Sequence, residues 1–383
     1  MASIVPPNAT QLVKFTDQVA GHDRLLCFST HDLMVIKPAT RKEIDFYEQA
    51  QQRPDFECWI PKCFGNLHMA TNSELAMLRE QHMNDTELSE TLLKAASSAE
   101  ANTPLQDHRP IDSQGRSLDD ILLCFLSLRC SQNVLHGFTR PCVLDLKLGT
   151  RLYDDDATPE KRDKMQKNAK GTTSEELGIR ISGMKVYNTI DRTWAIYDKQ
   201  FGRSRTADTI LDGLLSFFFP TSTYARANDP VIVRDEDQDT GSSSSNSNNR
   251  KRISGTKMNW ILENLLDDIG SIREYVQEHP ELEMYCASLL IVFEGDKDAA
   301  DTTWKCMLQK DQQEKTRSQE EEGQEEEEDE EDEPKLCDVR LIDFAHSRWD
   351  ANRQAQDEGL LKGLDSIMTL LDKCMQKQAN ENL

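Results

Sequence analysis

The sequence contains no apolar run of 18 residues, so we expect no transmembrane helix. Its first residues lack a basic stretch followed by an apolar one, so we expect no secretory signal. Ten cysteines occur without CxxC spacing, and the two that come closest to a pair, Cys58 and Cys63, do not belong to a set of four zinc ligands. Reduced thiols in the cytosol or nucleus are the interpretation that this pattern favours. No heptad seam is present, so we expect a monomer.

Basic residues are in deficit, since 45 Lys and Arg oppose 68 Asp and Glu and give a formal charge of −23. This deficit argues against a general nucleic-acid-binding surface. Twelve of the acidic residues fall within residues 320–333, where there is no base, and a run of like charge repels itself. We therefore predict a disordered insert at 309–335, and a second one at 235–257, where Ser and Asn dominate. A third polar stretch, at about 97–117, separates an N-terminal region from the middle of the chain.

Between these stretches the apolar pattern alternates between the strand and the helix period, which predicts an α+β fold. The length suffices for one large or two small domains, and we expect a smaller N-terminal and a larger C-terminal part. The predicted strands are residues 33–36, 141–149, 179–187, 194–197, 288–293 and 339–344, and the predicted helices are residues 43–50, 258–276 and 359–375.

Lys37 ends the first of these strands, and Glu43 and Glu48 lie in the helix that follows. A strand lysine that faces a helix glutamate is how protein kinases fix a lysine on nucleotide phosphates. No GxGxxG loop precedes it, and a lysine at a strand end is more often a solvated surface residue. The pattern alone leaves both interpretations open.

Asp145 and Lys147 lie two residues apart on a predicted strand, so their side chains point to the same face. The carboxylate can orient or deprotonate an attacking hydroxyl, and the lysine can neutralise phosphoryl oxygens. The alternative is an ordinary surface ion pair. Asp343 lies near the end of the apolar strand 339–344, a position that suits a carboxylate for Mg²⁺ beside a nucleotide, or else a turn or helix-capping aspartate.

Residues 161–170 contain five bases and one acid. On a helix, Lys161, Lys164 and Lys167 would share a face. Such a face suits a small polyanion, although a solvated helix face is the usual alternative. His346, three residues after Asp343, is a further candidate to donate to a phosphate, or else a structural histidine.

The segment PCVLDLKLG fits the PxxxDxKxG signature of the inositol polyphosphate kinases, with Pro141, Asp145, Lys147 and Gly149 in register. Further segments resemble blocks of the same family in the same order, namely IKPATRKEIDFYE, IPKCFG, LGIRISGMKVY, DKQFGRSRT, CASLLIVFEGD and VRLIDFAHS. The resemblance covers residues 21 to about 371 apart from the inserts. Within the family, AGHD and IDFAH are most similar to the multikinase branch. The hexakisphosphate kinases share IDFAH, whereas the trisphosphate 3-kinases have DFGKT where this sequence has DFAHS.

The resemblance implies a two-lobed fold related to that of protein kinases, with ATP between a smaller lobe (1–132) and a larger lobe (133–383) that holds the inositol phosphate. It implies a kinase that uses ATP and Mg²⁺ to phosphorylate hydroxyls of inositol tris- and tetrakisphosphate towards the pentakisphosphate. By position, Asp145 would orient the hydroxyl or act as its base, and Lys147 would bind the transferring phosphate. The other implied contacts are to ATP from Lys37, Asn133, Val134 and Asp343, to Mg²⁺ from Asp343 and Ser288, and to inositol phosphates from Lys147, Lys161, Lys164, Lys167 and His346.

One position departs from the family pattern. Gln132 stands where the strand between the lobes usually has an acidic residue, and the preceding LLCFLSLRC does not resemble that strand in the family. Adenine is usually held there through backbone groups, so Gln132 need not abolish ATP binding. Two alternatives therefore remain open: a hexakisphosphate kinase that makes pyrophosphates, and a non-catalytic scaffold that binds inositol phosphates or transcription factors.

The resemblance also leaves phosphoinositide lipid open as a second substrate, and it implies nuclear and cytoplasmic locations. Residues 249–252, NRKR, form a short basic cluster inside a predicted insert. Such a cluster is typical of a nuclear import signal, and a solubilising linker is the alternative.

Overall fold

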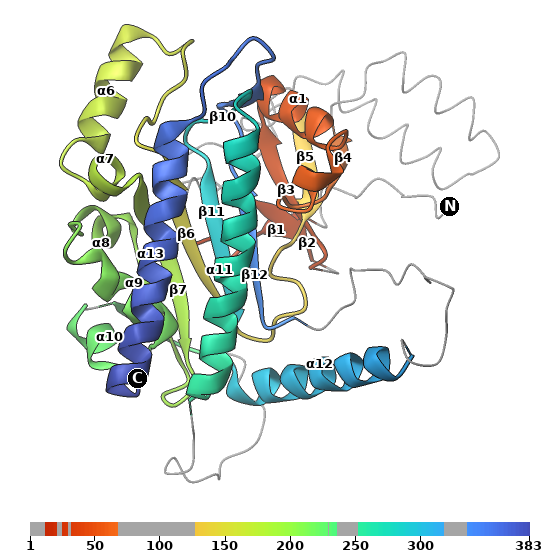
Figure 1. The fold of residues 1–383 in the computed structure, drawn as a ribbon, viewed down its shortest axis with the longest axis vertical. Coiled ribbons are helices and arrows are strands. Elements are labelled where there is room, and N and C mark those ends of the chain that lie inside the picture. Colours follow the sequence, from red (N-terminus) through yellow and green to blue (C-terminus); the bar gives the residue numbers. More distant parts are fainter. Residues whose placement is uncertain are drawn as a thin grey trace, which may run out of the picture.

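The computed structural model describes residues 12–20, 25–29, 32–67, 127–228, 230–235, 252–317 and 335–383, and every structural statement below concerns these residues. They form two large antiparallel sheets with helices packed around them (Figure 1). The polar stretch predicted at about 97–117 lies outside the described residues.

The first sheet comes from the N-terminal part of the chain and has the strand order β1-β2-β3-β5-β4. Its strands are β1 (Leu12–Lys14), β2 (Leu26–Phe28), β3 (Met34–Ala39), β4 (Cys63–Leu67) and β5 (Ser127–Gln132). The helix α1 (Arg41–Ala50) begins directly after β3, where the Thr40 hydroxyl accepts a hydrogen bond from the Glu43 amide. A short helix, α2 (Pro54–Glu57), links α1 to β4. This order brings β3, the start of α1 and β5 together.

The second sheet has the order β12-β11-β6-β7-β8-β9. Its strands are β6 (Pro141–Leu148), β7 (Ile179–Asn188), β8 (Thr193–Tyr197), β9 (Val231–Arg234), β11 (Ser288–Glu294) and β12 (Cys337–Ile342), and a separate two-stranded sheet pairs β10 (Leu282–Met284) with β13 (Ser347–Trp349). Along β6, Leu144, Leu146 and Leu148 are fully buried. Because side chains alternate along a strand, Asp145 and Lys147 face the other side of the sheet.

Eight helices of the described residues accompany the second sheet: α6 (Pro159–Ala169), α7 (Thr173–Leu177), α8 (Lys199–Arg203), α9 (Ile210–Phe218), α10 (Thr223–Ala227), α11 (Gly255–Glu278), α12 (Lys297–Arg317) and α13 (Glu358–Glu381). Figure 1 shows α11 and α13 side by side across the sheet. Their apolar stripes bury Ile261, Leu265 and Ile269 of α11 and Leu364 and Ile367 of α13 in the main core, as the helical spacing predicted.

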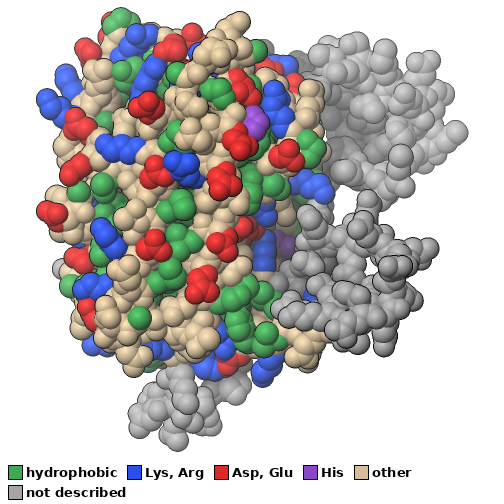
Figure 2. All heavy atoms as spheres, in the orientation of Figure 1, with side chains coloured by type: hydrophobic (Ala, Val, Ile, Leu, Met, Phe, Trp, Pro, Cys, Tyr) green, Lys and Arg blue, Asp and Glu red, His purple; other side chains and the backbone are tan. Residues whose placement is uncertain are grey.

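The outer side of α11 and α13 carries Lys and Arg interspersed with Asp and Glu, as Figure 2 shows for the face in view. No helix within the described ranges combines the length and the apolar character needed to cross a bilayer. The predicted boundary between the lobes, at residues 132 and 133, falls between β5 and β6.

An aromatic stack attaches α1 to the second part of the chain. The Phe46 ring of α1 stacks on Phe344, with centroids 4.4 Å apart, and on Trp349 of β13, at 4.3 Å. Aromatic contacts of this kind contribute about 0.5–1.5 kcal/mol each beyond the area that they bury. The stack therefore fixes the helix that carries Glu43 against the segment that follows β12.

The predicted ends of both inserts are wrong. α12 continues to Arg317, so residues 309–317 are helical. This stretch consists mainly of Gln, Lys, Glu and Arg, which favour helices, and it mixes both signs of charge. At the other insert, α11 begins at Gly255, where the Ser254 hydroxyl caps the Lys257 amide. Asp235, also assigned to that insert, pairs with Arg140.

The predicted end of the first strand is also wrong. β3 runs to Ala39, so Lys37 lies within the strand. Pro38 is tolerated there because β2 pairs with β3 only as far as Ile36, which leaves β3 an edge strand on that side.

Candidate active site

Three sequence elements that were predicted separately converge on one end of the second sheet. Ser288 of β11 lies opposite Lys147 of β6 on one side and opposite Ile342 of β12 on the other. Directly opposite residues of antiparallel strands share a face, and so do residues two apart on one strand. Lys147, Asp145 and Ser288 therefore share a face, and Asp343 follows Ile342 at the same end.

Asp145 is a buried carboxylate, 7% exposed, whose Oδ1 accepts no hydrogen bond from a described residue. Burial and the negative charge of Asp343 raise its pKa to about 6, against the opposing effects of Lys147 and Ser288. The Lys147 ammonium donates to the Cys286 carbonyl oxygen at 2.9 Å. Asp145 thus has a buried oxygen without a hydrogen-bond partner among the described residues, beside a cation that the backbone holds in place.

Asp343 lies just beyond the end of β12, with a left-handed backbone (φ 68°) that is uncommon for a residue other than glycine. Its side chain is 37% exposed and contacts the Lys37 ammonium. Desolvation alone would raise its pKa, but Lys37 and Lys147 outweigh desolvation and lower the pKa to about 2. Asp343 is thus an ionised carboxylate on a turn, where it can reach a ligand.

Lys37 comes from the first sheet and lies between two carboxylates. Its ammonium donates to Asp343 and, at 3.2 Å, to Oε1 of Glu43. Burial would lower the pKa of Lys37, but Asp343 and Glu43 raise it above its ordinary value. Glu48, the second glutamate considered at the sequence level, pairs instead with Arg41 on the solvent side of α1. The structure therefore selects Glu43 as the helix partner of this lysine.

The strand between the lobes pairs on both sides despite its unusual sequence, with one bulge in its pairing with β4. β5 pairs with both β3 and β4, and the Gln132 amide donates to the Lys62 carbonyl oxygen at 2.8 Å. Asn133 uses its side chain internally: Nδ2 donates to the Asp32 carbonyl oxygen (2.7 Å), and Oδ1 accepts from the Leu135 amide (3.1 Å). These two hydrogen bonds fix the segment that follows β5, and a role of Asn133 in ATP binding stays a prediction.

Val134 belongs to a small apolar cluster beside the charged groups. The cluster contains Val134, Leu135, Val143 and Val292, with Phe138 and Leu290 packed against it. Val143 lies two residues before Asp145 and so shares its face of β6. The members of the cluster are buried, and the contact of Val134 with ATP stays a prediction.

The predicted basic helix exists as α6, but its three lysines differ in their contacts. Lys161 lies 3.4 Å from Nε2 of His346, whereas Lys164 and Lys167 are exposed further along the helix. The structure brings Lys161 and His346 together, and it does not place Lys164 and Lys167 beside them.

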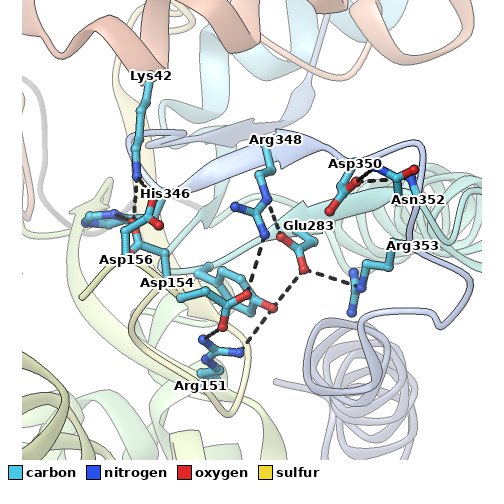
Figure 3. A network of polar contacts seen from close by, with 12 residues as sticks. Lys42, Arg151, Asp154, Asp156, Glu283, His346, Arg348, Asp350, Asn352 and Arg353 are labelled. Atoms are coloured by element: carbon cyan, nitrogen blue, oxygen red, sulfur yellow. Dashed lines mark hydrogen bonds and ion pairs between the residues drawn. The ribbon is translucent and has the colours of Figure 1, made fainter. Parts of the chain in front are cut away.

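His346 is held by Asp154, a residue that sequence reasoning missed. Its Nδ1 lies 2.8 Å from Oδ2 of Asp154, which also accepts from Lys42 of α1 at 3.3 Å (Figure 3). These side chains line a cleft of about 180 Å³ between α1 and β13. Burial would raise the pKa of Asp154, but His346 and Lys42 lower it. Nothing in the local sequence around Asp154 signals this contact, because its partners lie 112 and 192 residues away.

Arg180 is a second missed residue. It lies directly opposite Lys147 on β7, so the two cations share the face that carries Asp145. Its guanidinium donates to the Asn168 carbonyl oxygen at 3.1 Å, and burial together with Arg203 lowers its pKa. The alternation of buried Ile179 and Ile181 around it could have shown that Arg180 points away from the core.

The carboxylates fit a hard divalent cation that shares its coordination with phosphate. No group of three or more His, Cys, Asp or Glu side chains in the described ranges could hold a metal ion alone. Mg²⁺, however, is commonly bound by one or two carboxylates, with water and nucleotide phosphates completing its shell. Asp343 provides such a carboxylate, and Ser288 lies at the same end of the sheet.

Comparison with known proteins agrees with this geometry. The family described as inositol polyphosphate kinase matches residues 129–235 and 244–372, more than half of the chain. An inositol polyphosphate multikinase of Saccharomyces cerevisiae is 26% identical over 93% of this chain and 96% of its own length. One of Schizosaccharomyces pombe is 28% identical over 57% of this chain and 67% of its own. The human inositol hexakisphosphate kinase 1 is 22% identical over 94% of this chain and 93% of its own.

A solved structure is similar as well. The crystal structure of an S. cerevisiae inositol phosphate multikinase in complex with ADP and Mn²⁺ covers 89% of this chain and 98% of its own, with 21% identity and a TM-score of 0.54. This likeness concerns the fold, and it confirms the predicted two-lobed architecture.

Proposed function

The chain belongs to the inositol polyphosphate kinase family, and we propose that it transfers the γ-phosphoryl group of ATP to hydroxyls of inositol tris- and tetrakisphosphate, towards the pentakisphosphate. The observation that carries the proposal is the meeting of Lys37 and Asp343 with the Asp145–Lys147 pair at one end of the second sheet. Phosphoryl transfer requires positioning and charge neutralisation rather than covalent chemistry by the protein. Two carboxylates and two lysines in one place meet that requirement.

Lys37 would contact the phosphates of ATP, since Glu43 holds its ammonium beside Asp343. Asp343 would hold Mg²⁺, with Ser288 at the same end of β11. When bound, Mg²⁺–ATP supplies the phosphoryl group and part of the charge neutralisation. The ADP and Mn²⁺ in the yeast structure support a nucleotide and a divalent cation here.

Asp145 would orient the attacking hydroxyl or accept its proton. A pKa of about 6 keeps the carboxylate ionised near neutral pH while making it a stronger base than an exposed aspartate. Lys147 would neutralise the transferring phosphate, and Arg180 and Lys161 add positive charge for the other phosphates of the substrate.

The alternative enzyme is an inositol hexakisphosphate kinase, because the human relative of that name aligns over nearly all of this chain. One experiment tests the proposed activity and this alternative together. The purified chain is incubated with Mg²⁺–ATP and either inositol trisphosphate or hexakisphosphate, and the products are separated by charge. Phosphorylation of hydroxyls up to the pentakisphosphate supports the proposal. Pyrophosphate formed from hexakisphosphate alone replaces it with the alternative, and binding without turnover indicates a scaffold.

The expected cellular roles form a separate proposal. We propose nuclear and cytoplasmic locations, a monomeric state, and phosphoinositide lipid and transcription factors as further partners. Residues 249–251 of the basic cluster lie outside the described residues, and Arg252 donates to the Asn382 carbonyl oxygen at 2.8 Å. Replacing Arg250 and Lys251 by Ala in a fluorescent fusion should reduce nuclear accumulation; unchanged accumulation would exclude this cluster as the signal. Light scattering after size exclusion checks the monomer, and lipid vesicles check the lipid substrate.

A further inference from the structure

Arg129 is a buried cation in the middle of β5, only 5% exposed. Its cross-strand neighbour on β3 is Lys37. Directly opposite residues of antiparallel strands project from the same face, and like charges at such positions repel each other. The strand register therefore places a second positive charge next to the lysine that is proposed to contact ATP.

Glu43 joins the two cations. Its side chain is 2% exposed, and Oε1 accepts from the Lys37 ammonium at 3.2 Å and from Nη1 of Arg129 at 3.0 Å. A buried carboxylate needs such partners, because desolvating an unpaired charge is costly. The shared oxygen means that the position of Glu43, and with it that of Lys37, depends on Arg129.

Tyr47 holds Arg129 at a second point. The guanidinium carbon lies 3.8 Å from the centroid of the Tyr47 ring, a favourable cation–π contact. Glu43 and Tyr47 are four residues apart on α1, so they lie on one face of that helix. Arg129 thus attaches two successive turns of α1 to the sheet, which fixes the rotation and the height of the helix relative to Lys37.

We propose that Arg129 is a positioning residue for the nucleotide site: by holding Glu43 in place and sharing its charge, it keeps the Lys37 ammonium directed at the cleft. This inference rests on the proposed function, in which Lys37 contacts ATP. With Arg129 present, one Glu43 carboxylate pairs with two cations, so it neutralises neither of them fully. The Lys37 ammonium therefore still attracts Asp343 or a phosphate. Without Arg129, Glu43 would be free to turn wholly towards Lys37, and α1 would lose its attachment to β5.

The test is the affinity of Arg129→Met for ADP, measured by titration calorimetry in the absence of inositol phosphate. Methionine keeps much of the buried volume and removes the charge. We expect ADP binding to weaken about tenfold, with a similar rise in the KM for ATP and a change of less than about twofold in the KM for the inositol phosphate, as for a coupled charged network. An equal effect on both substrates, or no effect on ADP binding, would overturn the inference.

A double-mutant cycle shows whether Arg129 acts through Glu43. In a Glu43→Gln background, Arg129→Met should weaken ADP binding by no more than about twofold further, because the group through which it acts is already changed. If the two single losses simply multiply, Arg129 acts independently of Glu43 and the inference is wrong.

Matched variants separate positioning from folding. Arg53 also stacks on an aromatic ring near α1, 4.4 Å from the centroid of Trp349, but it pairs with the Gln49 carbonyl oxygen rather than with Glu43. Arg53→Met should therefore leave the ADP affinity unchanged. Tyr47→Phe keeps the ring and should also be neutral, whereas Tyr47→Leu should reproduce part of the loss.

Should Arg129→Met fail to fold, Arg129→Lys retains the charge but loses the planar guanidinium that stacks on Tyr47. It should show an intermediate loss of ADP affinity with a normal thermal midpoint. Wild-type affinity in Arg129→Lys together with wild-type affinity in Tyr47→Leu would overturn the inference. A wild-type chain that does not bind ADP would overturn the proposed function instead, so the two failures are distinct.

Discussion

The Lys37 ammonium contacts Oδ1 of Asp343, so that an ion pair spans the two large sheets between residues 306 positions apart. Burial alone would lower the pKa of Lys37 and raise that of Asp343, and their mutual attraction reverses both effects. Both groups therefore stay charged, which is the state that phosphate and Mg²⁺ require of them. The two charged groups are in contact with each other at the site proposed for the nucleotide.

Asp343→Ala should reduce turnover with Mg²⁺–ATP by about a hundredfold or more, because it removes the carboxylate proposed to hold the metal. The fold should survive, since Asp343 follows a strand and is partly exposed. Steady-state kinetics and a thermal unfolding curve check the two statements. Asp350→Ala, a loop aspartate beyond β13, is the control and should behave like the wild type. Near-normal turnover in Asp343→Ala would remove Asp343 from the site.

Asp145→Asn and Lys147→Ala should fail in different ways. Asparagine keeps the size of the side chain but cannot accept a proton from a hydroxyl. We therefore expect a large decrease in kcat and unchanged ADP binding. Lys147→Ala removes a cation that substrate and transition state both meet, so the KM for the inositol phosphate should rise as kcat falls. The measurement is full kinetics of both variants on one substrate at fixed salt. If Asp145→Asn retains most of its kcat, the Asp145–Lys147 pair is a structural ion pair.

The raised pKa of Asp145 predicts an acidic limb in the pH profile. If Asp145 must be ionised to act, kcat/KM should fall as the pH drops through about 6, roughly tenfold for each further pH unit. Asp343, with its pKa near 2, stays ionised throughout this range and contributes no limb there. A flat profile between pH 7 and pH 5 would show that the ionisation of Asp145 does not control the rate. The residual activity of Asp145→Asn should lack the limb.

Apart from their ends, the six predicted strands and three predicted helices are present, and Asp145 and Lys147 share a face as predicted, because alternation and helical spacing are properties of short segments. Other elements of the structure, such as α9 and α12, were not predicted. Local patterns also missed contacts that depend on folding. Asp154 meets His346 across 192 residues, and nothing near either residue signals it. Arg180 was visible in the alternation of β7, but its place beside Lys147 follows only from the register of two strands.

The errors at the ends of elements have local physical causes. Pro38 predicts the end of a strand, yet β3 continues through it because β3 has no partner strand beyond Ile36 on its β2 side. The Ser- and Asn-rich composition predicts an insert through Ser254, yet this serine caps α11. Residues 309–317 adjoin the acidic run, but their own composition favours the helix that they form.

Lys161 and Lys164 provide a matched pair on α6. Lys161 lies against His346, and Lys164 is exposed one turn further on. Lys161→Ala should raise the KM for the inositol phosphate by about tenfold, as expected when a charged contact to phosphate is lost, whereas Lys164→Ala should change it by less than about twofold. Lys164→Glu, which reverses the charge on the same helix, should raise the KM by more than Lys164→Ala does, through longer-range repulsion. Equal effects of the two alanine variants would mean that the whole face of α6 binds substrate.

The acidic run offers a test by deletion. Residues 320–333 carry twelve carboxylates, which should repel a polyanionic substrate over a distance of about one Debye length. Deleting residues 318–334 should leave kcat within a few-fold and lower the KM for the inositol phosphate, most clearly at low salt. Deleting 311–333 also removes the last turns of α12, so it should lower the thermal midpoint more than the shorter deletion does. A KM difference between the wild type and the shorter variant that does not change with salt would exclude electrostatic repulsion as the cause. Loss of folding in the shorter variant would show that the run is structural.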